Sequence, residues 1–308
     1  MVTTKSLKKK LISGDTLFDV VNFILLSCVL IAVLYPLYFV IIASFSDPDG
    51  IYQGKTYLLP YKPNITGYKI IFGYKDLWMG YANSLLYTTV GVLVNLVLTL
   101  TMAYPLSRKN LIGRGFFTFL MVFTMYFSGG LIPSYLLVRK LGMLNTIWAL
   151  VIPTGISVFN VIIVRTFFQS SIPEELYESA AIDGCSNTRF FFQMLLPLST
   201  AVVAVMVLFY GVGHWNTYFN ALIYISDRSK YPLQLILREI LVVSTEATRG
   251  MGEAMRREVA ANGNLDKQRL AELIKFGIII VSSLPVLILY PFLQKYFVKG
   301  VMIGSLKG

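Results

Sequence analysis

Six long apolar runs, spread from one end of the chain to the other, constrain its fold more than any other feature of the 308-residue sequence. A helix needs about 20 consecutive apolar residues to cross the hydrocarbon core of a bilayer, and every run reaches that length. The sequence therefore predicts an all-α, polytopic membrane protein. The six predicted transmembrane helices cover residues 17–45, 83–106, 116–137, 146–168, 198–225 and 276–297.

The composition also favours a bilayer as the solvent. Hydrophobic residues make up 56% of the chain and charged residues only 14%, compared with about 25% charged residues in soluble domains. The net charge of +11 indicates contact with anionic membrane lipid. Nucleic-acid binding is disfavoured, because the basic residues flank apolar runs and form no stripe interleaved with aromatic residues.

Lysine and arginine predict the orientation of the helices. The segments on one side of the membrane hold eleven of these residues, including Lys295 at the membrane edge. The two short loops on the other side hold six. Because cytoplasmic loops are enriched in basic residues, both termini are predicted to be cytoplasmic. The membrane domain then covers 17–297 and includes a long outer segment, 226–275. The predicted cytoplasmic segments are 1–16, 107–115, 169–197 and 298–308.

Glycine and proline indicate where a helix departs from regular geometry. Gly129, Gly130 and Pro133 lie within the third apolar run. This combination predicts that the third helix is broken or kinked, because glycine and proline are common causes of helix breaks.

Acidic residues are excluded from the middle of the six runs. All 16 aspartates and glutamates lie in loops or near the ends of runs, whereas ion-coupled carriers usually place ionisable groups at mid-membrane. A membrane hydrolase with paired carboxylates is disfavoured for the same reason, and one histidine with two cysteines gives no metal-site spacing. We therefore expect no catalytic residue and no metal ligand. An ATP-independent carrier or channel is the alternative function.

The first outer loop, 46–82, is rich in aromatic residues and contains six tyrosines and Trp78. Aromatic side chains often form a belt at the membrane interface. The other interpretation is a docking or sugar-contacting surface, because aromatic faces stack on sugar rings.

Residues 171–197 predict a short helix–turn–helix between the fourth and fifth transmembrane helices. Ser171 and Glu174 fit a capping box at the start of the first helix. Gly184 is placed to end that helix in a left-handed turn. Ser186 can cap a second helix that stops at Pro197. We call this segment, 171–197, the knob, since it is predicted to be a rigid projection on the cytoplasmic side.

The first helix of the knob offers two kinds of contact to a partner. Glu178 and Asp183 offer charges, and Ala180 and Ala181 offer small surfaces that allow close packing. Physical reasoning alone leaves a second interpretation open, because any loop at a membrane surface can be helical and amphipathic.

A specific motif in the knob resembles the EAA loop of ABC importer permeases. The family pattern is Glu-Ala-Ala, two residues, Asp-Gly, and an apolar stretch that ends in Leu-Pro. Ser179 replaces the first alanine, a change between small residues. The positions that match are Glu178, Ala180, Asp183, Gly184, Leu196 and Pro197.

Short motifs elsewhere extend the resemblance over nearly the whole chain. They are similar to motifs of oligosaccharide permeases of the lipo-oligosaccharide and polysaccharide-uptake type, which are relatives of the maltose permease. The motifs are Gly14-Asp15, Tyr35-Pro36, Ala43-Ser44-Phe45-Ser46, Trp215-Asn216 and the tail 299–308.

The resemblance implies a function and a set of partners. It implies an importer in a bacterial plasma membrane, in which this chain pairs with a different, second permease subunit. Two cytoplasmic ATPase subunits bind ATP and magnesium, so this chain needs no cofactor and is not an enzyme. An extracellular solute-binding protein delivers the oligosaccharide. The residues implied to couple the chain to the ATPase are Glu178, Ala180, Ala181, Asp183, Gly184 and Pro197.

Polar and aromatic residues in the fifth apolar run are candidates for the substrate pathway. On a continuous helix, His214 and Tyr218 share one face, and Asn216 and Asn220 share another. Such groups suit sugar hydroxyls and ring faces, but they equally suit hydrogen bonds between helices. A lone neutral histidine is more often a helix–helix partner than a proton relay. The full set of candidates is His214, Trp215, Asn216, Tyr218, Asn220, Asn160 and Asn95.

Overall fold

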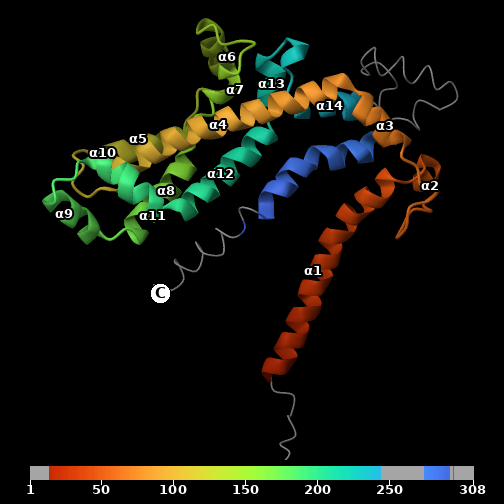
Figure 1. Ribbon diagram of the computed structural model, residues 1–308, viewed down its shortest axis with the longest axis horizontal. Helices are drawn as coiled ribbons and strands as arrows, with labels where there is room; N and C mark the ends of the chain where they lie inside the picture. Colours follow the sequence, from red (N-terminus) through yellow and green to blue (C-terminus); the bar gives the residue numbers. More distant parts are fainter. Residues whose placement is uncertain (1–13, 244–273, 292–293, 295–308) are drawn as a thin grey trace, which may run out of the picture. The chain divides into compact units, whose positions relative to one another are not determined.

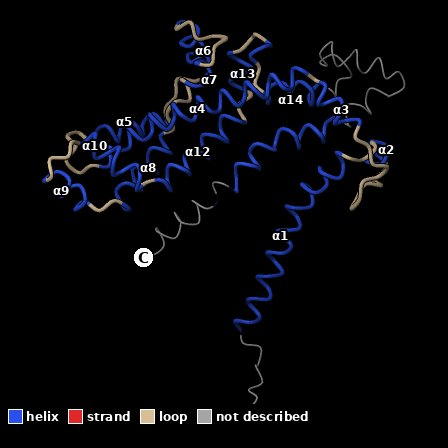
Figure 2. The backbone as a smooth tube through the Cα atoms, in the orientation of Figure 1, coloured by secondary structure: helices blue, strands red, loops and turns tan. Residues whose placement is uncertain are grey.

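The computed structural model describes residues 14–243, 274–291 and 294. The predictions for nearly all of both terminal tails, and for most of the outer segment 226–275, therefore lie outside the described residues. Every regular element among the described residues is a helix, which confirms the predicted all-α fold (Figure 2).

The helices vary widely in length, from single turns to 33 residues. In order they are α1 (Gly14–Ser44), α2 (Pro48–Tyr52), α3 (Thr66–Gly73), α4 (Lys75–Ser107), α5 (Arg114–Tyr126), α6 (Leu131–Lys140), α7 (Trp148–Val151), α8 (Val158–Ser171), α9 (Glu174–Ile182), α10 (Asn187–Phe190), α11 (Leu196–Leu198), α12 (Thr200–Trp215), α13 (Phe219–Tyr224) and α14 (Leu233–Val243). A π-helical turn covers Phe191–Leu195, a 3-10 turn covers Arg228–Lys230, and a further apolar helix covers Ile274–Pro291.

The chain divides into two compact units. The first comprises Met1–Ile70 and Asn264–Ile280. Its main element, α1, has 31 residues and a length of about 46 Å, so it can cross a bilayer as the sequence predicted. The loop after α1 folds back on the helix end, where the Asn64 amide donates to the Phe45 carbonyl at 2.7 Å. The Phe45 and Tyr68 rings pack there with centroids 5.0 Å apart.

The second unit comprises Ile71–Gly263 and Val281–Gly308 and is built around α4. The 33-residue α4 packs against α12, α8 and α14 (Figure 1). At one end, α4, α8, α10 and α12 enclose an apolar core that includes Phe190, Leu195 and Met206. Further along α4, α7 and α13 pack around a second core that includes Leu150 and Ala221.

Three described helices are long and apolar enough to cross a membrane: Thr16–Ser44, Lys75–Ser107 and Ile274–Pro291. Two bent helix pairs raise the number to five if each pair is one span. The structure therefore shows a helical chain with several apolar helices, and the count of six spans stays a prediction.

The predicted break in the third apolar run is confirmed. The chain bends by 109° between α5 and α6, across residues 127–130. Gly130 adopts φ +84°, a conformation that side chains with a Cβ rarely tolerate.

Two other runs that were predicted as continuous helices are interrupted. Within 146–168, Pro153 has no N–H to continue α7, and α8 restarts where the Ser157 side chain accepts a hydrogen bond from the Asn160 amide. Within 198–225, the chain bends by 81° at Ser199 and breaks again over 216–218.

Candidate functional site

The knob forms the predicted helix–turn–helix. α9 ends at Ile182, and Gly184 adopts the left-handed φ of +74° that the sequence predicted. A Cβ at Gly184 would meet nothing within 4 Å, so the backbone conformation alone favours glycine there. Ser186 caps α10 as predicted, since its Oγ accepts a hydrogen bond from the Arg189 amide at 3.3 Å.

Both ends of the knob differ from the prediction. Ser171 is the last residue of α8, and Pro173 takes the N-cap position of α9 with no side-chain hydrogen bond, so the capping box does not form. Glu174 instead pairs with Lys109. The second helix does not stop at Pro197 but continues to Leu198. A π-turn precedes Pro197, which has no N–H to donate to a regular helical ladder.

One face of α9 and the following turn are exposed. Ile182 is the most exposed apolar residue on this surface, with 86% of its area accessible. Ala180, by contrast, is only 3% exposed and packs into the core beneath α9. The prediction that Ala180 offers a surface to a partner was therefore wrong, because the helical turn that exposes Glu178 and Ala181 points Ala180 inward. The exposed face of α9 and the following turn comprises Glu175, Glu178, Ser179, Ala181, Ile182, Asp183 and Gly184.

Sequence reasoning missed Ile182. Its signal was an apolar residue at the end of a short helix whose neighbours are glutamate, serine and aspartate. Ile182 is the one large apolar side chain that this face presents, since its exposed neighbours are polar or small.

The only described ion pair of the knob joins it to the loop after α4. The hydrogen bond from the Lys109 ammonium holds the pKa of the Glu174 carboxyl below its usual range. The same bond raises the pKa of Lys109. The other three carboxylates of the knob, those of Glu175, Glu178 and Asp183, form no salt bridge with a described residue. The exposed face is therefore acidic.

Two of the predicted pathway residues form one hydrogen-bonded network inside the protein. His214 Nε2 lies 2.6 Å from Asn95 Oδ1. Asn95 is fully buried, and its Nδ2 donates to the carbonyls of Thr154 and Gly155 at 2.7 and 2.8 Å. These carbonyls lie in the interruption between α7 and α8, where the helical ladder leaves them without a partner. Asn95 thus satisfies polar backbone groups that would otherwise be unpaired in an apolar environment.

Gly91 makes room for this network. A Cβ on Gly91 would lie 2.5 Å from His214 Nε2, which is closer than real Cβ contacts. His214 and Asn95 therefore join α4, α12 and the α7–α8 interruption, as the helix–helix interpretation predicted. Contact of either residue with a substrate stays a prediction.

Trp215 has a similar internal contact. It is 4% exposed, and its Nε1 donates to the Ser282 carbonyl at 3.1 Å. Tyr81 on α4 donates to the adjacent Val281 carbonyl, also at 3.1 Å. Pro285 lies four residues after Val281 and has no N–H, so the Tyr81 hydroxyl replaces a missing helical donor.

The remaining pathway candidates lie around two helix breaks. α12 ends at Trp215 and α13 begins at Phe219. The prediction that His214 and Tyr218 share a helix face was therefore wrong. The same prediction for Asn216 and Asn220 was wrong for the same reason. Asn216 and Tyr218 are exposed in this break and Asn220 is half-buried. Asn160 is buried in the first turn of α8, next to the other interruption.

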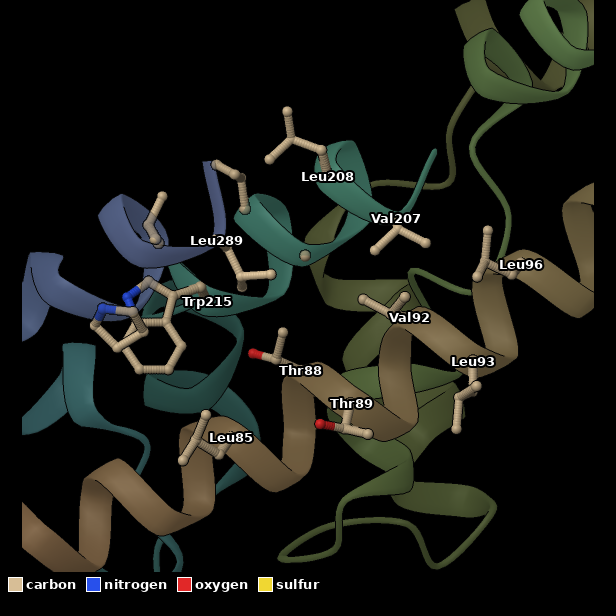
Figure 3. A pocket seen from close by; sticks show the side chains of 14 residues that line it. Leu85, Thr88, Thr89, Val92, Leu93, Leu96, Val207, Leu208, Trp215 and Leu289 are labelled. Carbon is tan, nitrogen blue, oxygen red and sulfur yellow. The ribbon is translucent and has the colours of Figure 1, made fainter. Parts of the chain in front are cut away.

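An apolar pocket of about 360 Å³ lies between α4, α12 and the end of the 274–291 helix (Figure 3). Leu85, Val92, Leu96 and Leu289 are among the side chains that line it, and it contains no charged group. Such a lining suits hydrocarbon and offers few partners to sugar hydroxyls, so this pocket is a poor candidate for the sugar site. The described residues contain no cluster of three or more potential metal ligands.

The chain is similar to known proteins over nearly its full length. No family model matches the chain. Protein LplC of Bacillus subtilis (strain 168) is 41% identical over 291 residues, which cover 94% of this chain and 95% of the relative. The polygalacturonan/rhamnogalacturonan transport system permease protein YtcP of the same organism is 42% identical over 295 residues, which cover 96% and 99%.

A solved structure is also similar over nearly the full length. It is the crystal structure of a bacterial ABC transporter involved in the import of the acidic polysaccharide alginate. The matching chain has a TM-score of 0.82 and 30% identity, and the similarity covers 96% of this chain and 100% of that chain.

Proposed function

The chain belongs to the family of membrane permease subunits of carbohydrate ABC importers, and we propose that it forms one half of the translocation pathway for an oligosaccharide. A second, different permease subunit forms the other half, and an extracellular solute-binding protein delivers the sugar. In importers of this family the ATPase is a separate subunit, so this chain is not itself an enzyme. ATP and magnesium bind to two copies of that subunit.

The exposed face of α9 carries the proposal for energy coupling. Ile182 offers an apolar anchor, and Glu178 and Asp183 offer carboxylates on either side of it along the chain. Protein–protein interfaces usually have an apolar centre and a polar rim. We expect Ile182 to enter a cleft in the ATPase subunit that has basic residues at its rim.

The proposed mechanism is alternating access. ATP binding closes the ATPase dimer and moves the knob, and the helices attached to the knob open the pathway to the other side of the membrane. α8 ends at Ser171 and α12 begins at Thr200, so both helices join the knob through only a few residues.

The names of two relatives favour an acidic substrate. YtcP is named for polygalacturonan and the solved transporter imports alginate, and both polymers carry carboxylates on their sugar units. We therefore propose that this chain transports an oligosaccharide derived from an acidic polysaccharide. Asn216, Tyr218 and Asn220 at the break between α12 and α13 would donate hydrogen bonds to its hydroxyl and carboxylate groups.

Reconstitution of the complex in proteoliposomes tests this function. We expect uptake of oligogalacturonate that requires ATP, the binding protein and both permease subunits, while the purified chain alone hydrolyses no ATP. Glu178→Lys should reduce uptake at least tenfold, because it reverses a charge on the exposed face of α9, whereas Glu178→Gln removes the charge without reversing it and should reduce uptake less. Uptake that persists without the ATPase subunit would support the carrier or channel alternative instead.

We also propose six spans with both termini in the cytoplasm: α1, α4 and the 274–291 helix are single-helix spans, and α5 with α6, α7 with α8, and α12 with α13 form one span each. Cysteine labelling tests this topology in a background with Cys28→Ala and Cys185→Ala. Ser229→Cys should react with a membrane-impermeant maleimide on intact spheroplasts. Asn110→Cys, exposed in the loop after α4, should react only after the membrane is opened. Labelling of Asn110→Cys from outside would contradict the orientation.

A further inference from the structure

A cation–π contact joins the knob to the end of α4. Arg108 follows the last residue of α4, and its Cζ lies 3.5 Å from the centre of the Tyr177 ring on α9. Among the described residues Arg108 forms no salt bridge, and its guanidinium group contacts the aromatic face of Tyr177. A guanidinium group at this distance stacks on the ring and is attracted by its quadrupole.

The same tyrosine also contacts the second helix of the knob. The Tyr177 hydroxyl donates to Asn187 Oδ1 at 3.0 Å, and its ring meets the Phe190 ring edge-on with centroids 5.4 Å apart. Tyr177 therefore connects Arg108 to both helices of the knob.

A second layer of aromatic contacts lies one turn earlier on α4. The ring of Tyr104 lies 6.5 Å from that of Phe190 and 5.3 Å from that of Phe191. Phe190 is 1% exposed, so this layer belongs to the protein core and fixes the end of α4 against the knob.

The ion pair of Lys109 with Glu174 contributes less to this attachment. The lysine side chain is 76% exposed, and exposed ion pairs are screened by water and salt. The half-buried stack of Arg108 on Tyr177 is better protected, so we expect it to dominate.

We propose that Arg108 and Tyr177 are positioning residues that clamp the knob to α4, so that α4 moves with the knob when the ATPase closes. This inference rests on the proposed function. α8 and α12 move with the knob because the chain joins them to it directly. The clamp would make α4 a third helix that moves with the knob.

The contacts along α4 show where such movement would go. α4 contains 33 residues and is about 50 Å long. Near its middle, Asn95 binds the α7–α8 interruption and His214 of α12. At its far end, Asp76 binds Arg228 Nε at 3.0 Å. A shift of α4 would therefore displace the α7–α8 interruption, α12 and segment 226–231 at the same time.

The test measures sugar uptake and ATP hydrolysis in the reconstituted complex. Arg108→Gln and Tyr177→Leu each remove the stack. Each should lower the number of sugars transported per ATP at least fivefold, while substrate-stimulated ATP hydrolysis stays within twofold of the unmodified protein. Tyr177→Phe is the matched control, because it keeps the ring face and loses only the bond to Asn187. It should keep the ratio within twofold.

A double variant makes the test specific to this contact. Arg108→Gln with Tyr177→Leu should be no worse than either single change, because residues that act through one contact are not additive. Additive losses would overturn the clamp. A parallel fall of uptake and hydrolysis, or loss of the ATPase subunit from the purified complex, would also overturn it, since the two residues would then serve docking alone.

Failure of the clamp can be told apart from failure of the proposed function. If the knob does not dock on the ATPase, Ile182→Asp will leave the ATPase subunit bound and hydrolysis unchanged. If the knob docks but the clamp is wrong, Ile182→Asp will disrupt the complex while Arg108→Gln leaves the transport ratio unchanged.

Discussion

Ile182→Asp should abolish ATP-driven uptake, with at least a tenfold loss in reconstituted vesicles. Ile182 is 86% exposed on α9, and complete burial of such a side chain is worth about 1.5–3 kcal/mol. Because about 1.4 kcal/mol corresponds to a tenfold change in affinity, loss of this burial weakens docking by roughly ten- to a hundredfold. The aspartate adds the cost of placing a further charge in an apolar cleft.

The measurement is co-purification of the ATPase subunit together with uptake. Ile182→Leu is the matched control, since it keeps the volume and the apolar character, and it should retain at least half of the uptake. The free chain should fold normally in either variant, because the side chain touches solvent and not the core. Full uptake by Ile182→Asp would show that the ATPase binds elsewhere.

Asn95→Leu should give the largest loss of stability of any single change in the α4–α12 contact. The substitution removes the partner of His214 Nε2 and of the carbonyls of Thr154 and Gly155. A buried polar group without a partner costs about 1–3 kcal/mol. With several groups affected at once, we expect a loss of at least about 3 kcal/mol and low recovery of folded protein.

Thermal unfolding of the detergent-solubilised complex measures this loss. Gly211→Ala is the control, because Gly211 lies on α12 beside α4. A Cβ there would lie at an ordinary distance of 3.9 Å from Val92. This variant should change the unfolding temperature little. An unfolding temperature for Asn95→Leu equal to that of Gly211→Ala would show that the carbonyls of the α7–α8 interruption have another donor.

Much of the secondary structure could be predicted from local sequence. The apolar runs at 17–45 and 83–106 became single helices, since an apolar helix satisfies its own backbone groups in a membrane. The turn at Gly184, the cap at Ser186 and the break at Gly130 also depend on backbone conformation and on neighbours within a few residues. These features were predicted correctly for that reason.

Predictions from local sequence patterns were wrong where the tertiary fold or a break in the chain overrode the pattern. Ser171 and Glu174 had the spacing of a capping box, but Glu174 pairs with Lys109 in the loop after α4, 65 residues away. Ala180 matched a motif whose residues were taken to face a partner, but the packing of α9 turned it into the core. The face shared by His214 and Tyr218 required a continuous helix, and the chain breaks after Trp215.

The sequence by itself determined that this chain is an all-helical membrane protein, where most of its helices lie, and that the knob contains the motif of an ABC importer permease. These properties follow from hydrophobic run length and from short-range backbone chemistry. Only the tertiary structure decided that Ile182 rather than Ala180 is exposed, that Asn95 serves a helix break 59 residues away, and that Arg108 stacks on Tyr177. Such contacts depend on which helices pack together, and residue spacing along one helix does not encode that.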